Sequence, residues 1–144
     1  MSMLVESTET IPPDNQGERR CRLPPFVDDK RYPPRSLKYV YLVHNHPEFP
    51  TNISKLDIAG IVKAARIHGA FAETKEGKVP LGIVAFFSNS HNPISASCDG
   101  FFEYSLGRRT EVVKWTHAEQ GQWLQEKAGT VTWLNETQFQ IDWN

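Results

Sequence analysis

Apolar runs in the central part of the chain predict most of its regular structure. Lys38–His44 is rich in β-branched and aromatic residues, as is typical of a strand, and Pro47 marks its expected end. From Ile53 to Gly69 the apolar residues recur at helical spacing, and a glycine is a natural stop. Val79–Phe87 is a continuous apolar run that predicts a buried strand. The expected order is therefore strand, helix, strand.

The C-terminal part alternates short patterned runs with turn residues. Four of these runs predict two hairpins, Gly100–Leu106 with Thr110–Trp115 and Thr130–Leu134 with Thr137–Trp143. Between the hairpins, His117–Lys127 carries Trp123 and Leu124 on one side and predicts a short helix. The fold class expected from all these elements is α+β, with a mixed or antiparallel sheet and one main helix packed on it.

The first 36 residues differ from the rest in their many prolines, which remove backbone donors and interrupt regular pairing. Short extended pieces are expected at Val5–Ile11 and Arg20–Phe26, separated by a turn over Asp14–Gly17. A chain of 144 residues suits one domain. We therefore expect a single domain over residues 1–144, with this partly irregular segment as its beginning.

Composition and charge argue against several classes of function. A net charge of -1 provides no general basic field for nucleic acid. No apolar window has the length of a membrane span, and the first residues lack the pattern of a signal peptide. Cys21 and Cys98 are too few for a disulfide framework and are expected to be buried free thiols. We expect a cytoplasmic protein, with a secreted effector as the alternative, that binds neither nucleic acid nor membrane.

His44 and His46 are the residues that most suggest chemistry. Side chains two apart on a strand point to the same side, so both imidazoles can reach one metal ion. Asp57 lies one helical turn beyond Ser54, on the same face, where the start of the helix brings its carboxylate to the imidazoles. Two histidines and one carboxylate form a catalytic zinc ligand set that leaves a position open for water. Zinc would lower the pKa of that water to about 7.

The segment His44–Asp57 resembles the signature of the JAMM (JAB/MPN) zinc metalloprotease family: His-x-His-Pro, six residues, then Ser-x-x-Asp. Its fixed positions are filled by His44, His46, Pro47, Ser54 and Asp57. The resemblance covers roughly residues 38–70. It implies the cytidine-deaminase-like JAB/MPN fold, in which the two histidines and the aspartate would bind Zn²⁺ and Ser54 would help to hold the oxyanion of the tetrahedral intermediate.

The resemblance also implies a general base, which this family takes from a glutamate upstream of the histidines. Glu6 is the favoured residue and Glu9 is the alternative, whereas Glu18 stands beside two arginines and suits a solvated surface position. Family members usually have a strand and a helix before this glutamate, and the present sequence begins close to Glu6. We therefore expect an N-terminally trimmed member, a fragment of a larger protein, or a domain completed by another chain.

The expected function is zinc-dependent hydrolysis of a peptide or isopeptide bond by a prokaryotic-type member of this family. The resemblance implies protein or peptide substrates, among them ubiquitin-like proteins. The alternative is a JAMM-like module that binds metal and a partner without catalysis. A metal-dependent nuclease is a third class, which the bulk charge disfavours.

Overall fold

The computed structural model describes residues 10–11, 20–21, 24–46, 52–90 and 97–144. Contacts divide the chain into two units, Met1–Lys38 and Tyr39–Asn144. In the first unit, β1 (Thr10–Ile11) pairs antiparallel with β2 (Arg20–Cys21). These strands fall within the two predicted extended pieces, whereas the predicted turn over residues 14–17 lies outside the described residues. The expectation of a single domain stays a prediction.

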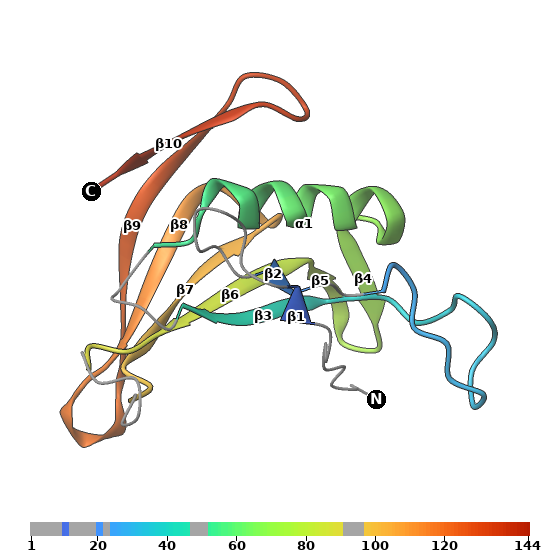
Figure 1. Ribbon diagram of the computed structural model, residues 1–144, viewed down its shortest axis with the longest axis horizontal. Helices are drawn as coiled ribbons and strands as arrows, with labels where there is room; N and C mark the ends of the chain where they lie inside the picture. Colours follow the sequence, from blue (N-terminus) through green and yellow to red (C-terminus); the bar gives the residue numbers. More distant parts are fainter. Residues whose placement is uncertain (1–9, 12–19, 22–23, 47–51, 91–96) are drawn as a thin grey trace. The chain divides into compact units, whose positions relative to one another are not determined.

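The second unit is built on a six-stranded sheet with the strand order β10-β9-β8-β7-β6-β3 (Figure 1). The strands of this sheet are β3 (Tyr41–His46), β6 (Gly82–Phe87), β7 (Gly100–Ser105), β8 (Arg108–His117), β9 (Trp123–Trp133) and β10 (Phe139–Trp143). Helix α1 (Lys55–His68) follows β3 along the chain. The smaller elements are the hairpin of β4 (Phe71–Thr74) with β5 (Gly77–Pro80), and the 3-10 turn η2 (Glu119–Gly121).

Strand β3 is the one parallel member of the sheet as described. It pairs with β6 from Tyr41 opposite Gly82 to His46 opposite Phe87, whereas the strands from β6 to β10 are antiparallel neighbours in chain order. A parallel pair needs a long crossover connection, and α1 with the β4–β5 hairpin provides it. The end of β3 and the start of α1 are thereby placed at the same end of the sheet (Figure 1).

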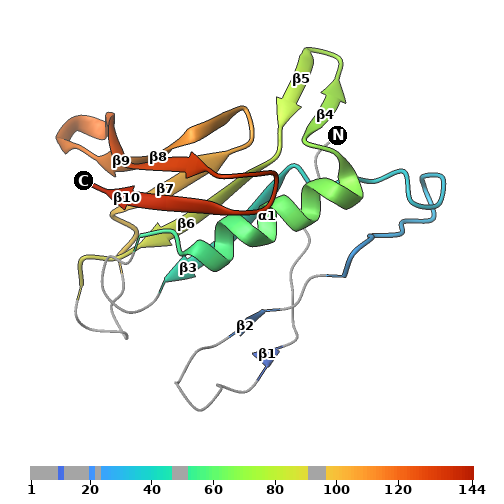
Figure 2. The same ribbon diagram turned by 90° about the horizontal axis from the view of Figure 1, so that it is seen from above.

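Helix α1 lies along one face of the sheet (Figure 2), and apolar residues of the helix are buried in the core that it shares with the strands. Ile58 and Ile61 of the helix and Ile53 just before it have no exposed surface. The sheet residues in the same core come from five strands: Ile83, Ala85, Phe87, Phe102, Tyr104, Val112, Val131 and Phe139. Because this burial removes apolar surface from water along the whole sheet, it holds the start of α1 in a fixed position above the strands.

The predicted α+β fold of the JAB/MPN type is wrong. The part of the chain that the structure describes is 47% strand and 15% helix. The largest local error is the predicted helix over 117–127, where Trp123–Lys127 of β9 instead pair with Val113–His117 of β8. Pairing with a neighbouring strand gives ladder hydrogen bonds and cross-strand packing, and these outweigh the intrinsic helical preference of Leu124, Glu126 and their neighbours.

The other elements match the predictions more closely. The predicted strand, the main helix and the two C-terminal hairpins are confirmed, with bounds shifted by a few residues. The apolar run 79–87 is divided between β5 and β6, and the β4–β5 hairpin had not been predicted. Cys98 is exposed, so the prediction of a buried thiol is wrong at that position. Over the described ranges, no helix combines the length and apolar character needed to cross a bilayer.

Candidate metal centre

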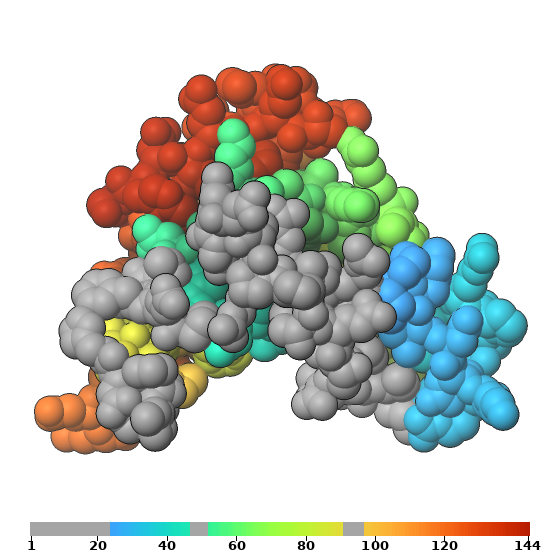
Figure 3. Space-filling model, viewed as in Figure 1, coloured from blue at the N-terminus to red at the C-terminus, as the bar shows by residue number. Residues whose placement is uncertain are grey.

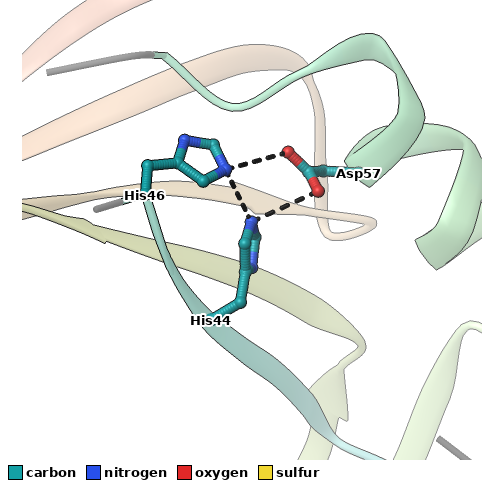
Figure 4. A group of neighbouring side chains, drawn as sticks. All are labelled: His44, His46 and Asp57. Atoms are coloured by element: carbon teal, nitrogen blue, oxygen red, sulfur yellow. Dashed lines mark hydrogen bonds and ion pairs between the residues drawn. The ribbon is translucent and has the colours of Figure 1, made fainter. Parts of the chain in front are cut away.

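Three side chains from β3 and α1 converge on one point (Figure 4). The Nε2 atoms of His44 and His46 are 3.0 Å apart. The Nε2 atom of His44 lies 3.2 Å from Oδ1 of Asp57, and that of His46 lies 3.6 Å from Oδ2. One potential ligand atom from each residue lies within 4.8 Å of the other two, so the group could hold a metal ion. The predicted convergence of these three residues is confirmed.

The alternation of β3 explains the position of the two histidines. Leu42, His44 and His46 are half-buried, while the residues between them are exposed. Residues at even positions of this strand therefore face α1, as the period of two requires. Asp57 is in the first turn of α1 and reaches back toward the end of β3. The site is thus created by one strand end and the helix that follows it.

The separations of the three side chains fit a small tetrahedral cation. Ligand atoms about 2.0–2.2 Å from such an ion lie ~3.3 Å from one another. The 3.0 Å between the two imidazole nitrogens and the 3.2 Å from His44 to Oδ1 of Asp57 are close to that separation, and the 3.6 Å from His46 is measured to the other carboxylate oxygen, Oδ2. Two imidazole nitrogens and one carboxylate oxygen are also donors that zinc accepts. The residues present therefore fit the Zn²⁺ ion that the sequence predicts.

Ser54 holds the carboxylate of Asp57 through a capping box at the start of α1. Its hydroxyl group and its backbone N–H each donate to Oδ2 of Asp57, at 2.7 Å in both cases. In return, the backbone N–H of Asp57 donates to the Ser54 hydroxyl at 3.1 Å. Oδ2 is therefore engaged by Ser54, whereas Oδ1 faces His44. This arrangement leaves Oδ1 as the natural ligand atom for a metal ion.

The surroundings of Asp57 favour its ionised form. Burial by itself would raise the pKa of the carboxyl group. Hydrogen bonds from His44 and His46, the charge of His44 and the hydrogen bond from Ser54 together outweigh burial and hold this pKa well below its usual range. Asp57 is consequently a carboxylate at neutral pH, which is the form that binds a metal.

The predicted general base Glu6 and its alternative Glu9 lie outside the described residues, as do Glu18 and Pro47. The role of Ser54 at an oxyanion also stays a prediction. Its contact with Asp57 had not been predicted from the sequence, although Ser-x-x-Asp before an apolar helix is a recognisable capping pattern. That pattern is the signal that could have revealed it.

Comparison of the chain with known protein families, with curated proteins and with solved structures gives no match in any of the three.

Replacing Ser54 by alanine is expected to weaken zinc binding by 10–100-fold, as is common when the partner of a metal ligand is removed. The same change should cost about 1 kcal/mol of folding free energy through loss of the helix cap. Competition with a chromophoric chelator and urea unfolding of the metal-free protein measure the two effects. Ser54→Thr retains a hydroxyl and should remain close to the wild type in both. An unchanged zinc affinity in Ser54→Ala would show that the hydroxyl does not orient Asp57.

Proposed function

We propose that His44, His46 and Asp57 bind Zn²⁺ and that the chain hydrolyses a peptide or isopeptide bond. The observation that carries this proposal is the convergence of the three donor groups at zinc-ligand separations. The agreement of residues 44–57 with the JAMM signature supports the reaction type. The proposal concerns the site alone, because the sheet-rich chain does not have the JAB/MPN fold that the signature implied.

The ligand set determines what this site would contribute to hydrolysis. Two neutral imidazoles and one carboxylate leave a bound Zn²⁺ with a net positive charge and room for a further ligand. A zinc ion in such a site acts as a Lewis acid and lowers the pKa of a coordinated water to about 7. Asp57 contributes the only negative charge among the three ligands, and Ser54 fixes the direction of its carboxylate. The chain itself thus orients the carboxylate ligand.

Hydrolysis of an amide also needs a group that takes a proton from water and returns it to the leaving amine. We assign this role to Glu6, with Glu9 as the alternative. Ser54 would assist the oxyanion if its hydroxyl turned from Asp57 toward the substrate. Since that hydroxyl has a single proton, it cannot donate to Asp57 and to an oxyanion at the same time. The two roles of Ser54 are therefore alternatives within one turnover.

The proposal is tested by metal analysis combined with hydrolysis. We expect one zinc ion per chain, and loss of activity on carboxymethylated casein after chelation, with recovery when Zn²⁺ is added back. A linear and a branched ubiquitin fusion would distinguish peptide from isopeptide cleavage. Iron in place of zinc would contradict the proposal, because two histidines and a carboxylate also form the ligand set of non-haem iron oxygenases. Zinc binding without hydrolysis would indicate the non-catalytic module instead.

A further inference from the structure

A cleft of about 680 Å³ lies between the start of α1 and strand β10. Its helix side includes Ser54 and Lys55, and its strand side includes Ile141 and Trp143. In the space-filling view, red atoms of the C-terminal strands border green atoms of the helix region at the surface (Figure 3). The cleft is formed by segments far apart in the sequence, so its existence depends on the sheet order.

Strand β10 is an edge of the six-stranded sheet as far as the chain is described. In an antiparallel pair, residues alternate between those that hydrogen-bond the partner strand and those whose N–H and C=O point away from it. Leu134 donates to the carbonyl of Gln138, and Asn144 donates to that of Ala128. Both hydrogen bonds fit the register in which β10 pairs with β9. They therefore determine which residues between Gln138 and Asn144 hydrogen-bond with β9.

It follows from this alternation that Gln140 and Asp142 hydrogen-bond with β9. The backbone N–H and C=O groups of Ile141 and Trp143 point the other way, toward the free edge. All four of these residues line the cleft, and only Ile141 and Trp143 direct their main-chain groups away from β9. The cleft therefore presents a row of main-chain donors and acceptors with the spacing of a β-strand, which is a template for one more strand.

The opposite wall of the cleft is continuous with the candidate metal centre. Ser54 lines the cleft and also donates to Oδ2 of Asp57. Next to it, Lys55 extends toward β10 and places its Nζ atom 5.6 Å from the ring of Phe139. A chain lying along β10 would consequently pass beside the residue that holds a metal ligand.

We infer that an extended segment of the polypeptide substrate binds in this cleft as an added strand on β10, and that this pairing presents its amide bond to the metal centre. The inference rests on the proposed function. Main-chain pairing gives affinity with little dependence on side chains, as in other cases of strand addition. The substrate class is thus an unfolded tail or linker, and a folded domain without such a segment is not a substrate.

Replacing Ile141 by proline tests the pairing, since it removes an N–H that faces the cleft and leaves the β9 hydrogen bonds intact. Proline is tolerated at such positions of an edge strand. We expect KM for carboxymethylated casein to rise about 10-fold, the equivalent of one to two hydrogen bonds, with kcat and zinc content unchanged. Leu134→Ala changes an exposed side chain between β9 and β10 that does not line the cleft, and it should behave as the wild type. An unchanged KM in folded Ile141→Pro would overturn the inference.

Amide hydrogen exchange provides a second test of strand addition, and this test uses the wild-type protein. In the zinc-loaded wild type, excess carboxymethylated casein should slow exchange of the Ile141 and Trp143 amides at least several-fold. The amide of Asp142 is directed into the sheet and serves as the internal reference. Hydrolysis without this protection would leave the proposed function standing and overturn the inference. Protection without hydrolysis would support strand addition and contradict the proposed function.

Discussion

Replacing His46 by alanine is expected to lower the affinity of the chain for zinc by more than about 100-fold and to abolish zinc-dependent hydrolysis. Removing a residue that hydrogen-bonds a metal ligand commonly lowers metal affinity 10–100-fold. Removing the ligand itself also removes a direct bond to the ion. The remaining imidazole and carboxylate, His44 and Asp57, would leave two positions to be filled by water. Competition with a chromophoric chelator measures the affinity, and casein hydrolysis measures the activity.

The matched control for this change is His117→Ala, which removes an exposed imidazole from β8. That side chain packs beside the ring of Trp123 and is not among the three converging ligands. Zinc affinity and activity should both remain at the wild-type level. Equal zinc affinity in His46→Ala and His117→Ala would place the metal at other residues, and the candidate metal centre would then lose its support.

Replacing Ile58 by alanine is expected to destabilise the fold by about 2–5 kcal/mol, the usual cost of deleting a large aliphatic side chain from a packed core. Ile58 has no exposed surface and follows Asp57 directly, in the first turn of α1. The cavity would lie between the helix and the sheet, beneath the residue that supplies the carboxylate ligand. Urea unfolding of the metal-free protein measures this change in the free energy of unfolding.

Ile67→Ala is the control on the same helix, because that isoleucine is 43% exposed. Surface substitutions usually change stability by less than about 0.5 kcal/mol. If Ile58→Ala lowered the free energy of unfolding no more than Ile67→Ala does, α1 would not be packed on the sheet as described. Such a result would also remove the physical basis for the position of Asp57.

The candidate metal centre could be predicted because its three side chains come from adjacent elements. His44 and His46 are fixed by the period of a strand, and Asp57 by the first turn of the next helix. Only one connection has to fold back for these groups to meet. By contrast, the contact of Ser54 with Asp57 depends on the rotamers of two side chains, and the resemblance to the JAMM signature gave the serine a different role.

The sheet-rich fold could not be predicted because it depends on which strands become neighbours. Trp123–Lys127 contains good helix formers, and its strand structure follows from pairing with β8. The turn of the β4–β5 hairpin at Lys75 and Glu76 is followed by Gly77, whose φ of 125° is open to glycine and to few other residues. The cleft beside β10 follows only from the strand order, because an edge strand has no distinct sequence pattern. A short motif thus predicted a site without predicting the fold that contains it.

The parallel pairing of β3 with β6 has a consequence for the order of folding. Strands β6 to β10 join successive neighbours, whereas Tyr41 must find Gly82 across the whole α1 crossover. Closing a longer loop costs more chain entropy, so the local hairpins form sooner than this pair. His44 and His46 therefore join the sheet among the last contacts of the fold. Chains with only the hairpins formed would hold neither β3 nor the start of α1 in place, and they would bind zinc more weakly than the completed fold.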